Sequence, residues 1–112
     1  METRKIVWLD VLARIAKSLK AKRKRIVLCH GVFDMLHVGH IRHFEAAKKL
    51  GEVLIVTITP DRFVNKGPGR PVFSERQRCE QVDALRVVDY VLLSSDGAAD
   101  IEALRPDLVV KG

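Results

Sequence analysis

The chain has 112 residues, which suffices for one domain with a sizeable core but leaves little for a second domain. Its apolar content of 47% and charged content of 30% exclude a disordered chain, and its longest apolar run, Val53–Ile58, is far shorter than the roughly 20 residues that cross a bilayer. The net charge of +6 belongs to the first 25 residues, which hold nine basic and two acidic side chains.

Two cysteines, Cys29 and Cys79, lie in apolar segments, and neither belongs to a C-x-x-C pair. Isolated cysteines of this kind predict buried free thiols in a reducing compartment rather than a disulfide framework or a zinc site. The first residues also lack the apolar run of a signal peptide. We therefore expect a cytoplasmic protein that does not enter a membrane.

Residues 7–21 are predicted to form a basic amphipathic helix, because apolar residues recur at helical spacing: Trp8, Val11, Leu12, Ile15, Ala16 and Leu19. The basic run 22–25 could contact nucleic acid or an acidic membrane, or form a solvated helix end. The solvated end is favoured over nucleic acid because no aromatic residues interleave with the charges. We divide the chain into this N-terminal helix, residues 1–24, and a main domain, residues 25–112.

The main domain is predicted to begin with a βαβ unit. Residues 26–29 and 53–59 have the composition of buried strands, and helical spacing between them involves Ile41, Phe44, Ala47 and Leu50. Gly31 is expected to end the first strand, and Gly51 to end the helix. The unit spans about 34 residues, which suits a single right-handed crossover.

The same alternation continues after a Gly/Pro loop over residues 67–71. Ser74 is expected to cap a helix that runs to about Arg86, with Gln77 as its capping-box partner. A strand at 90–93, a helix at 100–104 and a strand at 108–110 follow. The pattern predicts the α/β class, with a Rossmann-like, doubly wound parallel sheet. Because the chain stops directly after the last strand, we expect a fold truncated at its C-terminal end and belonging to a longer protein.

The segment 31–40, Gly-Val-Phe-Asp-Met-Leu-His-Val-Gly-His, lies between the first strand and its helix, where ligands of open α/β sheets bind. His37 and His40 are three residues apart, which places them on one face of the first helical turn. Gly39 leaves room for phosphates to approach the backbone, and the helix N-terminus adds N–H groups and a positive dipole end. The segment therefore predicts a polyphosphate site.

Other interpretations of these residues remain open. Two histidines at a helix start can be ordinary polar residues, and His37, His40 and His43 could suggest a metal site. The first and third of these point to different faces, however, and no cysteine or acidic residue nearby completes a ligand set, so no metal site is predicted. His30 and His43 are interpreted as structural. Asp34 could bind a metal ion, but an aspartate in a tight turn more often bonds to backbone N–H groups, which is the favoured interpretation.

The segment 31–40 resembles the H-x-G-H signature of the cytidylyltransferase-like nucleotidyltransferases, including the preceding G-x-F-D. The resemblance extends from about Arg25 to Gly112. Within it, Asn65-Lys66-Gly67 and Arg70-Pro71-Val72 resemble the bacterial heptose-1-phosphate adenylyltransferases and the related domains fused to sugar kinases.

This resemblance implies transfer of a nucleoside monophosphate from ATP or CTP to a sugar phosphate or polyol phosphate, with release of pyrophosphate, in nucleotide-sugar biosynthesis. It implies Mg²⁺ as cofactor, held largely by the phosphates of the nucleotide. Homodimers are common among similar proteins, and fusion to a sugar-kinase domain is one expected arrangement. The residues leave the choice between ATP and CTP open.

The resemblance also implies roles for individual residues. The implied nucleotide-binding set is Val32, Phe33, His37, Gly39, His40 and Lys66, in which the two histidines and the lysine are catalytic. Arg78, on the first turn of the helix that follows Ser74, and Arg86, near its end, would bind phosphate or support the acceptor site.

The family carries a further nucleotide-contacting segment, rich in Ser and Thr, and nothing in residues 94–112 resembles it. An alternative function is therefore a non-catalytic nucleotide-binding or docking module of a larger protein. Nucleic-acid binding through residues 20–25 is a weaker third hypothesis.

Overall fold

The computed structural model describes residues 5–64 and 67–111, which alternate between helices and strands. The elements are α1 (Leu9–Ala21), β1 (Ile26–Gly31), α2 (Val38–Lys48), β2 (Val53–Ile58), the short 3-10 helix η1 (Asp61–Phe63), α3 (Glu75–Asp83), β3 (Tyr90–Leu93), α4 (Gly97–Leu104) and β4 (Leu108–Lys111). The predicted α/β class is confirmed.

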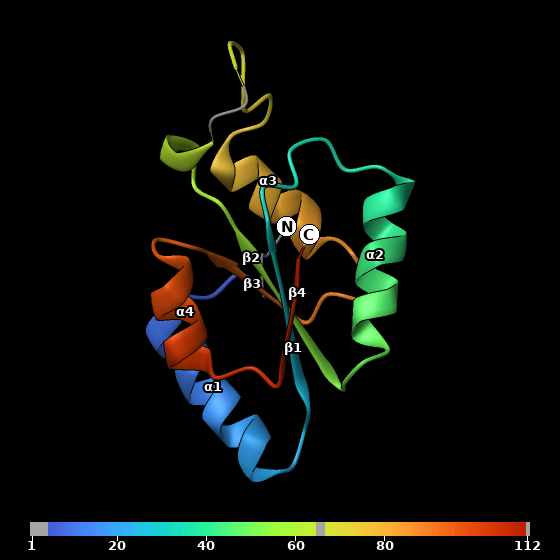
Figure 1. Cartoon of the computed structure of the whole chain (residues 1–112), viewed down its shortest axis with the longest axis vertical. Helices are drawn as coiled ribbons and strands as arrows, with labels where there is room; N and C mark the ends of the chain where they lie inside the picture. The colour runs from blue at the N-terminus through green and yellow to red at the C-terminus, as the bar shows by residue number, and fades with distance from the viewer. Residues whose placement is uncertain (1–4, 65–66, 112) are drawn as a thin grey trace.

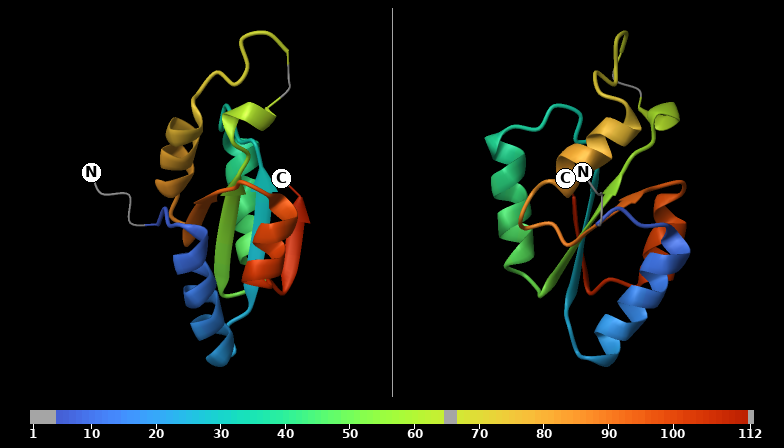
Figure 2. Two further views of the ribbon diagram at one scale, coloured as in Figure 1. Left: turned by 90° about the vertical axis from the view of Figure 1, so that its left-hand side faces the viewer. Right: turned by 180° about the vertical axis from the view of Figure 1, so that it is seen from behind.

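The four strands form one parallel sheet in the order β3-β2-β1-β4. The chain moves outward from β1 through β2 to β3, and then crosses back to place β4 on the other side of β1. Figures 1 and 2 show α2 on one side of the sheet and α1 and α4 on the other, so the predicted doubly wound arrangement is present. The direction of winding changes at β1, whose carboxyl end is therefore where a ligand crevice is expected.

The core consists of two layers separated by the sheet, because alternate residues of each strand point to opposite faces. In β1, Val27 and Cys29 pack on the side of α2, whereas Ile26 and Leu28 pack on the side of α1. Both cysteines are free and buried, as predicted, and burial raises the pKa of each thiol to about 11.

The helix α1 belongs to the same folded unit as the sheet. Leu12 and Ala16 are buried in one cluster with residues of β1, β2 and α4, so the proposed division at residue 24 does not separate two cores. Residues 5–7 also lie beside the edge strand β3, where Val7 N–H donates to the Val91 carbonyl and Val91 N–H donates to that of Lys5. Among the described residues no helix is long and apolar enough to cross a membrane.

Several predicted boundaries shift for identifiable reasons. Helix α3 ends at Asp83, because a turn closed by Leu85 N–H and Val82 O directs Leu85 and Val87 into the core, and Arg86 lies beyond the helix. Helix α4 begins earlier than predicted, since the Asp96 carboxylate caps its first turn. Strand β1 extends two residues beyond the predicted range 26–29 and includes Gly31 as its last residue.

Gly51 follows the end of α2 but serves a different purpose from the predicted helix stop. A Cβ atom at this position would lie 2.7 Å from the Arg25 carbonyl oxygen. Glycine is therefore needed for the close approach of two backbone segments.

Leu12→Ala tests whether α1 stabilises the domain. Removal of this fully buried side chain should lower the free energy of unfolding by about 2–5 kcal/mol, since it opens a cavity between α1 and the sheet. Urea unfolding followed by circular dichroism measures the change. The exposed Arg14→Ala on the same helix should change stability by less than about 0.5 kcal/mol. Equal stability of the two variants would contradict a shared core.

Candidate functional site

The two predicted histidines cap the N-terminus of α2 reciprocally. Gly39 N–H donates to Nδ1 of His37 at 3.0 Å, and His37 N–H donates to Nδ1 of His40 at 3.2 Å. The ring centroids are 4.1 Å apart. The spacing of three residues thus places both rings on the first turn, as predicted, and the histidines perform the task of a capping box.

In the neutral form of each ring, these caps select the tautomer. Each Nδ1 accepts a backbone N–H, so the single proton of each neutral imidazole resides on Nε2. Each neutral ring then carries its N–H donor at Nε2, the nitrogen that the cap does not use. Two such donors beside the positive end of α2 suit an anionic ligand.

Gly39 and Phe33 shape the turn around the histidines. A Cβ atom at Gly39 would lie 2.7 Å from Cε1 of His37, so glycine makes room for the imidazole ring that folds over it. Phe33 adopts a left-handed conformation with φ of 51°. Its buried ring contacts His40 edge-on, with centroids 5.9 Å apart, and packs on Phe44. The Phe33 side chain therefore packs against His40 and restricts the position of its ring.

Arg78 is fully buried and joins three segments at the carboxyl edge of the sheet. Its Nη1 donates to the carbonyls of Val32 and Thr59, at 2.9 and 2.7 Å, and its Nε donates to that of Phe73 at 3.0 Å. Its Nη2 pairs with Asp61 at 2.7 Å. The buried guanidinium thus holds these loops together.

Asp34 anchors the loop that precedes α3. Its carboxylate accepts the backbone N–H groups of Val72 at 2.7 Å and Phe73 at 2.9 Å, with Arg70 at 3.5 Å. Burial alone would raise the pKa of this carboxyl, but these donors outweigh burial, so that its pKa lies below the ordinary value. The sequence predicted that this aspartate bonds backbone N–H groups. It did not predict that these groups belong to residues 38 and 39 positions further along the chain.

The other predicted site residues are distributed differently. Val32 follows β1 at the site, with its carbonyl engaged by Arg78. Arg86 is exposed in the turn before β3, at the edge opposite the histidines, so the structure does not bring it to them. Lys66 lies outside the described residues. Within residues 5–64 and 67–111, no three His, Cys, Asp or Glu side chains converge on a metal position.

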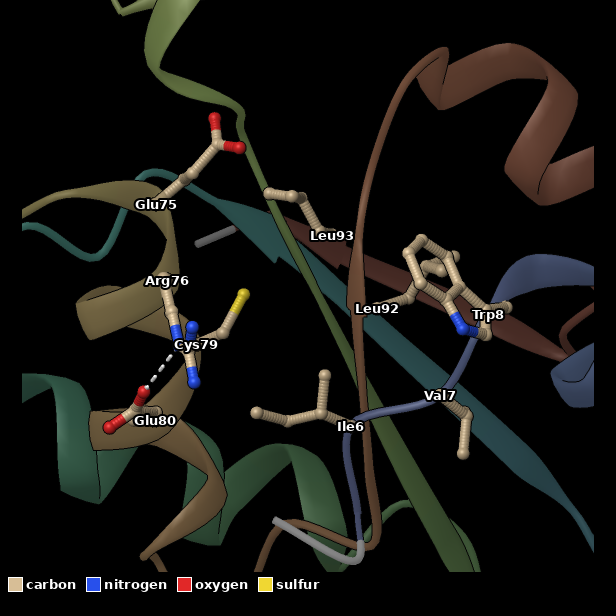
Figure 3. Close-up of a pocket in the computed structure, with 9 residues that line it drawn as sticks. All are labelled: Ile6, Val7, Trp8, Glu75, Arg76, Cys79, Glu80, Leu92 and Leu93. Atoms are coloured by element: carbon tan, nitrogen blue, oxygen red, sulfur yellow. Dashed lines mark hydrogen bonds and ion pairs between the residues drawn. The ribbon is translucent and has the colours of Figure 1, made fainter.

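A groove of about 400 Å³ lies at the β3 edge and shares no residue with the histidine pair. Figure 3 shows Ile6, Val7 and Trp8 on one side of it and the side chains of α3 on the other. Its polar groups include Arg76 and Glu80, which pair with each other at 3.1 Å. The groove is mostly apolar and lacks the convergent donors found at α2.

Sequence reasoning missed a polar network beside β1. His30, interpreted as structural, contacts the hydroxyl of Thr57 at 2.7 Å and that of Thr59 at 3.3 Å. The sequence does contain a signal for this network. Side chains alternate between the two faces of a strand, so Thr57 and Thr59 lie on the same face, and Thr57 pairs with His30 in the neighbouring strand.

The cytidylyltransferase-like family model matches residues 28–112. Among curated relatives, the bifunctional protein HldE of Desulfatibacillum aliphaticivorans is 39% identical, and those of Geobacter metallireducens and Campylobacter fetus are 40% identical. The alignments cover 96–97% of this chain and 23–24% of the relatives, so the chain spans about a quarter of their length.

A solved structure supports the same relationship. The lipopolysaccharide core biosynthesis protein of Thermoplasma volcanium has a TM-score of 0.71 to this chain at 33% identity. The match covers 77% of this chain and 72% of that protein. The resemblance inferred from the H-x-G-H segment is thereby confirmed.

Arg78→Lys tests whether this arginine is a loop anchor. Lysine cannot reproduce the fork that reaches three carbonyls and Asp61, so the free energy of unfolding should fall by about 3–5 kcal/mol. Urea unfolding provides the measurement, with the exposed Arg76→Lys on the same helix as control. A variant of unchanged stability and weakened phosphate binding would instead support the phosphate-binding role.

Asp34→Asn tests the loop anchor through its pH dependence. A folded-state pKa below the unfolded one means that the carboxylate stabilises the fold above the unfolded pKa, near 3.9, and loses this contribution as pH falls through the folded pKa. The stability difference between wild type and variant should therefore be full at pH 7 and shrink below about pH 4. Denaturant unfolding across this range measures it, with the exposed Glu45→Gln as charge control. A difference that persists unchanged at pH 2 would contradict the assignment.

Proposed function

The chain belongs to the cytidylyltransferase-like family, and from this premise we propose that it transfers the adenylyl group of ATP to a sugar 1-phosphate or polyol phosphate, releasing pyrophosphate. The observation that carries the proposal is the reciprocal cap of His37 and His40, which directs two Nε2 donors from a helix N-terminus. The relatives named HldE and the lipopolysaccharide core biosynthesis protein favour a role in nucleotide-sugar biosynthesis.

The chemistry requires no covalent enzyme intermediate. An oxygen of the acceptor phosphate attacks the α-phosphorus of ATP, forming a new phosphorus–oxygen bond as the bond to the β-phosphate breaks and pyrophosphate leaves. Negative charge gathers on the oxygens around the α-phosphorus in the transition state. Two preoriented imidazole N–H donors stabilise that charge without reorganising during the reaction.

The negative charge of the phosphate groups calls for cations, which Lys66 and Mg²⁺ are proposed to supply. Lys66, in the loop after β2, is proposed to bind the triphosphate or the acceptor phosphate. Mg²⁺ would arrive with the nucleotide, held by its phosphate oxygens, and would neutralise part of their charge. The Asp34 carboxylate accepts backbone N–H groups, so it is not proposed as a ligand of this ion.

Replacement of the two histidines can separate catalysis from helix capping. Asn is a good N-cap residue and Gln is favoured at the third helical position, so His37→Asn and His40→Gln retain acceptors for the capping N–H groups. Each variant should keep its stability but lose about 10²- to 10³-fold in turnover, because one donor to the transition state is removed. Arg42→Gln, exposed on the same helix, should retain turnover.

The assay is pyrophosphate release with Mg²⁺, comparing ATP with CTP against a panel of sugar 1-phosphates and polyol phosphates. Turnover with CTP alone would overturn the choice of ATP but keep the reaction class. Full turnover in both histidine variants would contradict the mechanism. Nucleotide binding without pyrophosphate release would favour the alternative function, a non-catalytic binding or docking module.

A further inference from the structure

Seven basic side chains and no acidic one fall within residues 14–25, which cover the second half of α1 and the turn that leads to β1. Figures 1 and 2 show this segment projecting beyond the sheet, at the end of the molecule away from η1 and the loop before α3. All strands of a parallel sheet begin at one edge, so the turns that enter β1, β2 and β4 lie together there. The run of basic residues is therefore one part of a surface to which several turns contribute.

Backbone hydrogen bonds hold the turns before β2 and β4 against this segment. The N–H groups of Glu52 and Val53 donate to the Arg25 carbonyl at 2.9 and 3.1 Å, and Asp107 N–H donates to the Ile26 carbonyl at 2.9 Å. Each of these turns adds an exposed basic side chain of its own. We call the combined surface the basic edge, and its members, all exposed, are Lys22, Arg23, Lys24, Arg25, Lys49 and Arg105.

Within the described part of the chain, no carboxylate forms an ion pair with the basic edge. Glu52 accepts the backbone N–H of Arg25 at 2.6 Å, and Asp107 accepts that of Ile26 at 2.7 Å. The acids of these turns thus bind the backbone and leave the basic side chains without a counter-charge. Lys48 differs from them, because it pairs with Asp89, and it is not counted in the basic edge.

The end of a helix does not by itself account for this concentration of charge. Cations complement the C-terminal dipole only within the last turn of a helix. Lys22 is the C-cap of α1, whereas residues 23–25 lie beyond it, and Lys49 and Arg105 belong to other turns. Like charges gathered on one surface repel one another, and a polyanionic partner would remove that repulsion.

The chemistry of the basic edge favours a lipid surface over a nucleic acid. Single-stranded nucleic acid stacks on aromatic rings, and reading of bases in a duplex commonly uses Asn or Gln; the basic edge contains neither kind of residue. Leu50, in contrast, is 50% exposed beside Lys49, and it precedes Gly51, which packs on the Arg25 carbonyl. Clustered bases with an exposed apolar side chain are the features that an anionic bilayer requires.

We propose that the basic edge binds the anionic headgroups of a lipid bilayer, with Leu50 contacting the boundary between headgroups and acyl chains. The carboxyl edge, which carries His37 and His40, lies at the other end of the strands, roughly 20 Å away for strands of six residues. The candidate site would therefore face the solvent while the chain is bound. This inference is independent of the proposed reaction, because the two surfaces share no residue.

Co-sedimentation of the whole chain with lipid vesicles tests the proposal. The chain should bind vesicles of phosphatidylcholine that contain about 30% phosphatidylglycerol, and should not bind vesicles of phosphatidylcholine alone. Raising the salt from about 50 to about 500 mM should release it, because salt screens exposed charges. Equal binding to both kinds of vesicle, or no binding to the anionic vesicles at low salt, would overturn the proposal.

Neutral variants then locate the surface. The double variant Lys22→Gln, Lys24→Gln should bind anionic vesicles about 25-fold more weakly, since each basic side chain near a bilayer contributes about fivefold. The matched control, Arg42→Gln with Arg62→Gln, removes the same charge from exposed positions outside the basic edge and should bind within about twofold of wild type. Equal weakening of the two double variants would overturn the assignment. The salt dependence of the wild type tests the charge independently of either variant.

Leu50→Ser tests the apolar contact. The variant keeps every charge of the basic edge but should bind anionic vesicles about threefold more weakly, because buried apolar area adds to electrostatic attraction at a bilayer. Unchanged affinity would overturn the contact of Leu50 with the bilayer.

Comparison with nucleic acids separates the two kinds of polyanion. In about 150 mM salt, a DNA duplex and polyuridylate should each bind the chain more weakly, per mole of phosphate, than the anionic vesicles do. The reverse order of affinities would overturn the proposal and identify the basic edge as a nucleic-acid surface.

Discussion

The carboxyl edge of the sheet depends on one buried guanidinium. Where β1 and β2 end, their carbonyl groups leave the strand ladder, and a buried carbonyl without a partner costs about 1–3 kcal/mol. Arg78 satisfies the carbonyls of Val32, Thr59 and Phe73 at once and places its charge against Asp61. Three segments that are distant along the chain are thereby brought to one point beneath the turn that leads to His37.

Asp34 is the electrostatic counterpart of this arginine. The cation gathers carbonyl oxygens, and the anion, a few residues before the histidine pair, gathers the backbone N–H groups of Val72 and Phe73. Phe73 is held by both, through its N–H and its carbonyl. Each named residue of the G-x-F-D segment therefore has a structural role. The aspartate fixes a distant loop, and the ring of Phe33 contacts His40. The glycine makes room for the Phe33 ring, since a Cβ atom at Gly31 would lie 2.7 Å from Cζ of Phe33.

The sequence predicted what depends on local periodicity. Strand composition, helical spacing and the Ser74 cap located the four strands and the four α-helices, although not the short helix η1. The spacing of His37 and His40 placed both rings at the start of one helix. It could not assign Arg78, because an arginine on a first helical turn has the same local pattern whether it faces solvent or the core. The end of α3 was also missed, since packing of Leu85 and Val87 against the core, and not propensity, turns the chain there.

Gly39 has a structural role that the sequence did not predict. Its small size was predicted to admit phosphates, whereas in the structure it accommodates the ring of His37, which caps the helix and accepts the Gly39 N–H. A histidine whose ring caps the helix in this way requires the absence of a side chain two residues later. The H-x-G-H spacing is thus a stereochemical requirement of the paired donors: the glycine fixes the first ring, and the second ring closes the cap by accepting the His37 N–H.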